Sequence, residues 1–357
     1  MGPLHELDSR RFETPAILKK LADASRQLAE FKGVASSIPN QTILVNTLGL
    51  QEAKDSSAIE NIVTTHDELF RNATFPDAVT GAAKEVARYR QALNAGFTAV
   101  AEHHLLTTRH IVEVQSELEP SRAGFRKLPG TALRTDTGAL VYTPPPPDEV
   151  VGLMSDLERF INDDRQFDAD PLIKMALAHH QFESIHPFYD GNGRTGRIIC
   201  VLYLVKARLL DIPVLYLSRH IVRTKADYYR LLQDVRDRDV WEDWVLYMLT
   251  AVERTATDGI AAVGAIRDAL LDVKHRVRDR FKFYSQDLIN NLFMHPYTKI
   301  EFVQRDLQVS RLTAARYLDA LAGGGILEKR KIGRSNYYIN IRLFRILTGD
   351  ALVEGNG

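Results

Sequence analysis

The chain has 357 residues, enough for two or three domains with a sizeable core. Lys plus Arg and Asp plus Glu both number 46, so no overall charge draws the protein to nucleic acid or to a membrane surface. The single cysteine excludes a disulfide framework, and no apolar run reaches the ~20 residues of a membrane span. Because no signal peptide precedes Leu4, we expect a cytoplasmic protein without a membrane partner.

Most of the first 240 residues or so carry apolar side chains at three- and four-residue spacing, which predicts helices. The predicted helices span 15–32, 41–54, 80–103, 148–162, 171–184, 194–209 and 225–236. The segment between Phe125 and Pro147 has strand and turn character, which predicts a hairpin. A charged helical stretch from 256 to 280 then leads into a different C-terminal pattern.

Residues 186–197, between the fifth and sixth predicted helices, combine the side chains that a nucleotide site needs. Three glycines let backbone N–H groups approach phosphate, and a helix that starts beside them adds its positive end. Asp190 is suited to Mg²⁺, and Arg194 and Arg197 are suited to the outer phosphates. His186 can accept a proton near neutral pH.

Other interpretations of these glycines explain less. Gly191, Gly193 and Gly196 satisfy G-x-G-x-x-G, but a dinucleotide fold needs a buried strand before them, whereas residues 181–185 follow a helical run. A Walker loop would have Lys and then Ser or Thr after the last glycine, where Arg197 stands. A plain turn between helices explains the glycines, but not the histidine, aspartate and arginines around them.

Residues 298–341 predict a small winged-helix unit. Its parts are a helix over 300–307, a second helix from Ser310 to Leu321, and strands over 326–332 and 336–341 joined at Gly333, Arg334 and Ser335. From Gly323 to Arg345 the basic residues outnumber the one acid, Glu328, and they are Lys329, Arg330, Lys331, Arg334, Arg342 and Arg345. Such a wing could lie along DNA, and docking against protein is the alternative.

The loop at 186–197 matches every fixed position of H-x-F-x-[D/E]-G-N-G-R-x-x-R and therefore resembles the signature of the Fic family. The resemblance implies transfer of AMP from ATP to a hydroxyl side chain (Ser, Thr or Tyr) of a target protein or of the chain itself, with release of pyrophosphate. It assigns His186 as the base, Phe188 as the anchor of the loop, and Asp190 as the ligand of Mg²⁺ or Mn²⁺. The other implied ATP-binding residues are Glu60, Pro187, Gly191, Asn192, Gly193, Arg194 and Arg197, with Tyr228, Tyr229 and Leu232 around the adenine.

A second motif gains meaning from this resemblance. Residues 56–61 could form any solvated helix face, but they also fit the family's inhibitory pattern [S/T]-x-x-x-E-[G/N] through Ser56, Glu60 and Asn61. Glu60 would pair with Arg197 and occupy the fork that the γ-phosphate needs. Some relatives also use this glutamate to remove AMP, and the sequence leaves that reaction open.

The predicted hairpin resembles the family's flap, which holds the backbone of the target by strand addition. The residues implied are Gly130, Thr131, Ala132 and Leu133. An ordinary surface hairpin is the alternative for the same residues. Because edge pairing reads backbone, the identity of the target stays open.

The combined prediction is a mainly α protein: a Fic helical core with a short β-hairpin flap, an N-terminal helical inhibitory region and a C-terminal winged helix-turn-helix. We divide it into an inhibitory region (1–105), a catalytic core (106–255), a helical connector (256–285) and the winged helix (286–357). The predicted function is a self-inhibited protein adenylyltransferase, and the family also implies a homodimer. The alternative function is a DNA-binding transcriptional regulator whose core senses ATP, although a sensor would not need the base His186.

Overall fold

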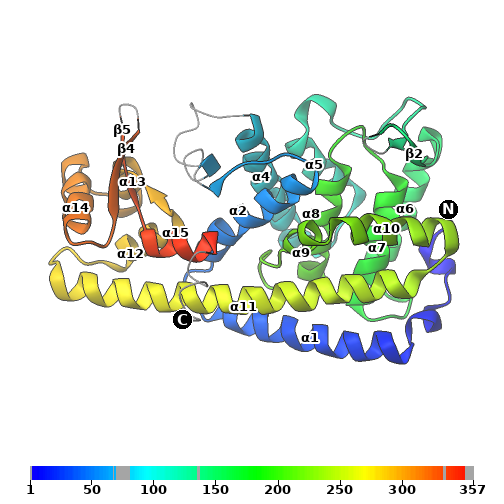
Figure 1. The fold of residues 1–357 in the computed structure, drawn as a ribbon, viewed down its shortest axis with the longest axis horizontal. Helices are drawn as coiled ribbons and strands as arrows, with labels where there is room; N and C mark the ends of the chain where they lie inside the picture. Colours follow the sequence, from blue (N-terminus) through cyan, green and yellow to red (C-terminus); the bar gives the residue numbers. More distant parts are fainter. Residues whose placement is uncertain (1, 67, 70–80, 135–136, 333–334, 350–357) are drawn as a thin grey trace. The chain divides into compact units, whose positions relative to one another are not determined.

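The computed structural model describes residues 2–66, 68–69, 81–134, 137–332 and 335–349 (Figure 1). The chain forms two compact units, one of residues 1–32, 52–62 and 88–257 and the other of residues 33–51, 63–87 and 258–357. Four helices contribute residues to both units, namely α1 (Pro15–Ser36), α2 (Thr42–Ile59), α4 (Gly81–His103) and α11 (Trp241–Arg280). In the described part of the chain, no helix has the length and apolar character that crossing a membrane requires.

The first unit is otherwise built of shorter helices and one small hairpin. They are α5 (Thr108–Leu118), β1 (Leu133–Arg134), β2 (Leu140–Tyr142), α6 (Pro147–Asn162), α7 (Pro171–Ile185), α8 (Asn192–Lys206), α9 (Leu217–Arg223) and α10 (Lys225–Arg238), with 3₁₀ turns at Leu4–Glu6, Ser9–Phe12 and Pro120–Arg122. The two strands pair antiparallel, with Leu133 opposite Tyr142. The predicted mainly α fold with a short hairpin is confirmed.

The centre of this unit is the helix pair α7 and α8. Asp170 caps α7 by accepting the N–H of Leu172, Pro171 takes the first helical position, and every residue from Leu172 to Ile185 is buried. A helix buried on all sides belongs to the core rather than to the surface. The loop that joins α7 to α8 is therefore held from both ends by core helices.

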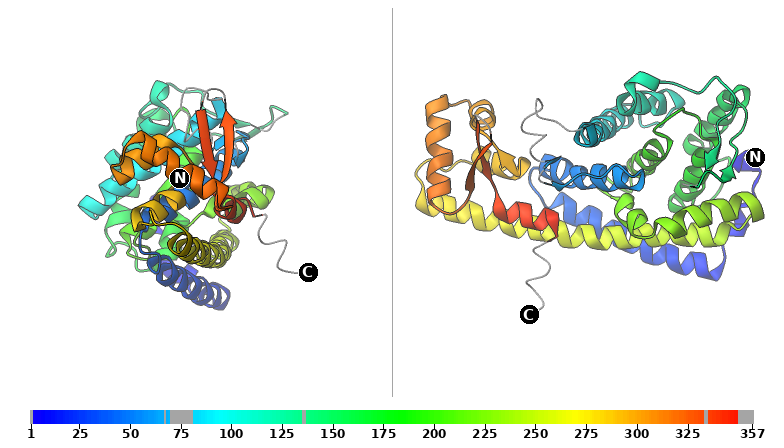
Figure 2. Two further views of the ribbon diagram at one scale, coloured as in Figure 1. Left: turned by 90° about the vertical axis from the view of Figure 1, so that its left-hand side faces the viewer. Right: turned by 45° about the horizontal axis from the view of Figure 1, so that its top comes forward.

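The second unit ends in the predicted arrangement of helices and strands. Its elements are α12 (Gln286–Met294), β3 (Tyr297–Thr298), α13 (Ile300–Leu307), α14 (Arg311–Gly323), β4 (Glu328–Ile332), β5 (Ser335–Ile339) and α15 (Ile341–Thr348). Ser310 caps α14 as predicted, since its side chain accepts the N–H of Thr313. The strands β4 and β5 lie side by side and antiparallel, and β3 adds a third strand that the sequence did not predict (Figure 2).

Several helix ends differ from the predicted ranges. The helix predicted to end at 54 continues to Ile59, and the one predicted to begin at 194 begins at Asn192. The helices α5, α9, α12 and α15 were not predicted separately. Of the predicted turn, Gly333 and Arg334 lie outside the described residues, and Ser335 is the first residue of β5.

Candidate functional site

The loop between α7 and α8 has a backbone that its sequence explains. His186 ends α7 in the left-handed region at φ 47°, because the proline that follows disfavours a further helical residue. Gly191 precedes α8 at φ 79°, a conformation that glycine adopts without a steric penalty. The loop is therefore a sharp turn between the end of α7 and the start of α8.

The side chains of Phe188 and Asn192 stabilise the conformation of this loop. Phe188 is fully buried, its backbone bridges to that of Phe125, and the two rings lie 5.4 Å apart. The Asn192 side chain accepts the N–H of Phe188 and donates to its carbonyl, both at 2.9 Å. The amide side chain of Asn192 thus fixes the loop, which leaves its backbone N–H at the start of α8.

The side chain of His186 is held in a neutral state. Burial first, and then the charges of Arg236 and Arg126, lower the pKa of His186 to about 4. The ring is therefore uncharged near pH 7 and has a nitrogen lone pair that can accept a proton.

The start of α8 is suited to phosphate. The first N–H groups of a helix have no partner within the helix, and in α8 these belong to Asn192, Gly193 and Arg194. The Asp190 carboxylate lies beside them, accepts the N–H of Gly191 at 2.7 Å, and has about half of its side chain exposed. One accessible carboxylate next to a phosphate site fits Mg²⁺, which keeps several waters and takes its other ligands from phosphates.

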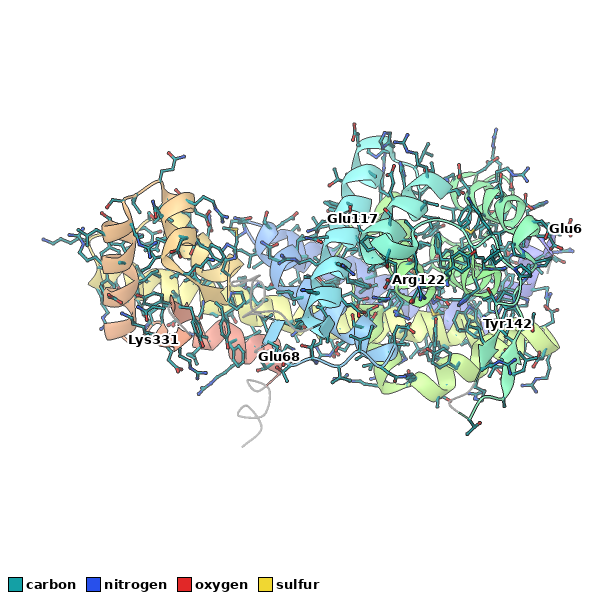
Figure 3. All side chains as sticks on the ribbon, turned by 90° about the horizontal axis from the view of Figure 1, so that it is seen from above. Glu6, Glu68, Glu117, Arg122, Tyr142 and Lys331 are labelled. Atoms are coloured by element: carbon teal, nitrogen blue, oxygen red, sulfur yellow. The ribbon has the colours of Figure 1, made fainter. Side chains whose placement is uncertain are left out.

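The two arginines of α8 already have acidic partners. Arg194 donates to Glu119 Oε1 at 2.6 Å. The exposed Arg122, labelled in Figure 3, lies 3.7 Å from Asp190. Arg197 is 1% exposed, and its Nη2 lies 2.8 Å from Glu60 Oε1. Burial acts against the charged form of Arg197, but the charge of Glu60 keeps the pKa of Arg197 above its ordinary value.

The end of α2 presents the predicted inhibitory residues to Arg197. The hydroxyl of Ser56 accepts from Arg197 Nε at 2.8 Å, and the backbone carbonyl of Ser56 accepts from Nη2 at 3.0 Å. Burial would raise the pKa of Glu60, but the Arg197 charge holds that pKa below its ordinary value. Three hydrogen bonds from one guanidinium therefore end on Ser56 and Glu60.

The geometry of the helix end explains why asparagine follows Glu60. Asn61 is left-handed at φ 62°, its N–H bonds to Ala58 O, and the N–H of Ile62 bonds to Ser57 O. This is the Schellman pattern, in which glycine or asparagine is favoured at the left-handed position. Lys225 at the start of α10 donates to the Asn61 side chain at 3.0 Å and so holds the same turn.

Gly193 makes room for the inhibitory carboxylate. A Cβ at this position would lie 2.3 Å from Glu60 Oε1 and 3.0 Å from Arg197 Nη1. A side chain here would displace Glu60 from its place beside Arg197.

The residues expected around adenine differ in their exposure. Tyr228 is buried, and its hydroxyl lies 2.9 Å from His179 Nε2. Leu232 is also buried, whereas Tyr229 is 45% exposed and packs edge-on against Tyr228. Of the three, Tyr229 presents a ring to solvent, and the predicted adenine contact stays a prediction.

The predicted flap residues lie on the first strand of the hairpin and just before it. Gly130 is left-handed at φ 97°, and Leu133 begins β1 opposite Tyr142 of β2. Tyr189 of the nucleotide loop accepts the N–H groups of Lys127 and Leu128 at 2.8 and 3.0 Å. The base of the hairpin is therefore tied directly to the loop.

Sequence reasoning missed several residues that shape the site. Gln115 donates to the carbonyl of Asp190, Glu119 pairs with Arg194, and Lys225 holds Asn61. Arg126 binds the carbonyl of His186 at 2.9 Å. None belongs to a local motif, so only the folded chain brings them to the loop.

Comparison with known proteins covers most of the chain. Residues 18–98 match the family described as Fic/DOC family N-terminal, residues 105–204 match the Fic/DOC family, and residues 270–343 match the C-terminal domain of SoFic-like protein adenylyltransferases. Protein adenylyltransferase fic-1 of Caenorhabditis briggsae is 30% identical over 37% of this chain and 24% of its own length. Protein adenylyltransferase Fic of Culex quinquefasciatus is 29% identical over 44% of this chain and 30% of its own length. The chain thus spans under a third of these two relatives.

Solved structures share the fold. A Fic family protein from Desulfovibrio desulfuricans G20 superposes with a TM-score of 0.59 and 21% identity, covering 91% of this chain and 96% of that one. Fic-1 (residues 134–508) from C. elegans gives 0.55 and 22%, covering 69% and 72%.

Proposed function

The chain belongs to the Fic/DOC family, and from that membership we propose that it is a self-inhibited protein adenylyltransferase. It would transfer AMP from ATP to the hydroxyl of a Ser, Thr or Tyr on a target protein or on itself. The observation that carries the proposal is the loop from His186 to Arg197, where a neutral imidazole, a helix start and two arginines meet.

Each part of this loop has a chemical task in that reaction. His186 would take the proton of the attacking hydroxyl as its oxygen bonds to the α-phosphorus of ATP. The bond from that phosphorus to the bridging oxygen of the β-phosphate breaks, and pyrophosphate leaves with the electron pair. The amides at the start of α8, together with Arg194 and Arg197, would stabilise the charge on the phosphates. Mg²⁺ or Mn²⁺ held by Asp190 would neutralise further phosphate charge.

The contacts of Arg197 support self-inhibition. Ser56 and Glu60 take three of its hydrogen bonds, so the guanidinium has no fork left for a γ-phosphate in that geometry. Removal of Glu60 would free one N–H of Nη2 and leave the guanidinium charge without its acidic partner. We therefore expect Glu60→Gly to raise transfer by about ten- to a hundredfold, the equivalent of one charge-assisted hydrogen bond.

The test is transfer of label from α-labelled ATP in the presence of Mg²⁺, with self-modification as the first product to measure. The proteins are the wild type, Glu60→Gly, the double variant Glu60→Gly with His186→Ala, and Asp23→Gly as a matched acid-to-glycine control on α1. Strong labelling in Glu60→Gly alone supports three parts of the proposal: transfer of AMP, inhibition by Glu60, and His186 as the base. Absence of labelling in every protein, with ATP still bound, would overturn transfer and favour a nucleotide-sensing regulator.

Target, assembly and reversal belong to the same proposal. A chase of the labelled variant with unlabelled wild-type protein tests whether Glu60 also supports removal of AMP. Sedimentation of the full chain tests the homodimer that the family leads us to expect.

A further inference from the structure

The C-terminal end of α7 is capped by side chains at every one of its last carbonyls. Helices leave their final carbonyls without a partner in the helix, and here the four carbonyls from Glu183 to His186 each accept a side-chain hydrogen bond. Arg236 donates to Glu183 O at 3.2 Å, and Tyr142 donates to Ser184 O at 2.9 Å. The remaining two belong to Arg126.

Arg126 holds the backbone of the base itself. Its Nε donates to His186 O at 2.9 Å, and its Nη2 donates to Ile185 O at 3.3 Å. The backbone N–H of Arg126 also donates to Pro187 O at 2.9 Å. Arg126 is 2% exposed, so these bonds form away from competing water.

The three capping residues make further contacts with one another and with the residues beside them. The Arg236 guanidinium lies 4.0 Å above the ring of Tyr142, and its Nε donates to the Ser184 hydroxyl at 2.9 Å. Arg126 donates from Nη2 to the carbonyl of Pro145, just after β2. Arg126 precedes the hairpin in the chain and Tyr142 ends its second strand, and both bind the helix end that carries His186.

We propose that Arg126, Tyr142 and Arg236 are positioning residues, which hold the backbone of His186 for proton transfer and couple it to the target-docking hairpin. The inference rests on the proposed function, because it names the residues that support the base of that reaction. Capping by three side chains holds a left-handed residue that its own backbone would not prefer. A target strand that moves the hairpin would then move the base with it.

The charges of the two arginines act on His186 as well. The groups that act on the pKa of His186 are Arg236 from α10, Arg126 from the segment before the hairpin, the backbone of Glu183 on α7 itself, and Glu60 just after α2. Cations disfavour the imidazolium. Replacing either arginine by a neutral residue should therefore move the titration of His186 to higher pH, whereas lysine should not.

The experiment separates support of the backbone from charge. In the Glu60→Gly background we would compare Tyr142→Phe, Arg126→Lys, Arg126→Gln, Arg236→Lys and Arg236→Gln. Arg238→Gln is the matched control, since Arg238 lies on α10 and pairs with Asp234. The measurements are kcat for self-labelling, the Kd for ATP, and the titration of the His186 ring by NMR, assigned with His186→Ala.

We expect kcat to fall at least fivefold in all five variants while the Kd for ATP stays within twofold. The His186 midpoint should rise by about half a unit or more in the two Gln variants and stay in place in the two Lys variants and in Tyr142→Phe. Tyr142→Phe loses only a hydroxyl, so it keeps the proposal testable if an arginine variant fails to fold.

Two results would overturn the proposal. One is an unchanged kcat in folded Tyr142→Phe and Arg126→Lys. The other is a fall in kcat that is accompanied by a rise of the same factor in the Kd for ATP. If Glu60→Gly transfers no AMP at all, the proposed function fails separately. The NMR arm then decides the positioning role alone: a change in the chemical shift of the His186 ring in Tyr142→Phe and Arg126→Lys, with an unchanged titration midpoint and with no such change in Arg238→Gln, supports it, and an unchanged chemical shift rejects it.

Discussion

Arg197 in the first unit and Arg330 in the second both pair with a glutamate, at 2.8 Å and 2.5 Å, yet their surroundings differ completely. The side chain of Arg197 is 1% exposed and that of Arg330 is 49% exposed. Other cations that make the wing basic in sequence also have surface partners, such as Lys329 with Asp319 and Arg342 with Asp272. Exposed pairs of this kind contribute little, whereas a buried guanidinium must be matched by its environment.

This contrast bears on function. Arg197 of α8 is held in one geometry by Ser56 and Glu60, so replacing any of these three residues should alter activity. The wing is less basic than its composition indicates, because acids on neighbouring elements neutralise part of it locally. An electrostatic case for DNA binding therefore loses support from the same residues that first indicated it.

The largest expected difference between the two units is the loss of stability when Arg197 or Arg330 is replaced. Arg197→Met should lower the free energy of unfolding by about 2 kcal/mol, because Ser56 loses its partner and Glu60 keeps an unpaired charge that is one-third exposed and so partly solvated. Arg330→Met should change it by less than about 0.5 kcal/mol. Urea unfolding of both variants measures this, and equal losses would contradict the contrast.

Ser56 in the first unit and Ser310 in the second allow a sharper comparison, because replacing either one should lower the free energy of unfolding by a similar amount. Ser56→Ala removes an acceptor from buried Arg197, and Ser310→Ala removes the cap of α14, each costing about 1 kcal/mol. Only Ser56→Ala should also raise self-labelling, by about threefold to tenfold, because it loosens the guanidinium. A similar gain in Ser310→Ala would mean that general destabilisation, rather than release of Arg197, activates the protein.

A smaller effect is expected from Lys225, which holds the turn after Glu60 through Asn61. Lys225→Ala should raise transfer by about twofold to threefold, in keeping with a partly exposed contact. Its effect should vanish in the Glu60→Gly background, since Lys225 acts on inhibition alone. Lys329→Ala, which breaks an exposed pair in the second unit, is the matched control, and additive gains in the double variant would argue that Lys225 acts by a route other than the contact of Glu60 with Arg197.

The two regions also differ in how much their sequence predicts. The segment from His186 to Arg197 is predictable because its chemistry lies in twelve consecutive residues, which form the loop after α7 and the first turns of α8. Glu60 is 137 positions from Arg197, so only resemblance to a known pattern brought them together before the structure did. Arg126 and Arg236 act on backbone carbonyls, which every residue has, so no sequence pattern marks their partners.

The elements show the same division. The long periodic helices were predicted, but α2 runs past its predicted end through Asp55, Ser56 and Ser57, because burial there outweighs their weak helix preference. A two-residue strand such as β3 has no period to detect, and it forms because β5 offers it an edge.

The smallest expected effect concerns pH: the strength of inhibition by Glu60 should hardly change between pH 6 and 8. The pKa of Glu60 lies below its ordinary 4.5, so the pair with Arg197 is fully formed above that value and is lost only as pH falls through the lower folded value. The ratio of Glu60→Gly to wild-type transfer should therefore stay within twofold from pH 6 to 8. Burial raises the pKa of Glu52 and of Glu183 to about 7, so both titrate in this window, but they are present in both proteins and largely cancel in the ratio. A ratio that falls steadily toward one at pH 6 would mean that the inhibitory contact depends on one of these two acids rather than on ionised Glu60.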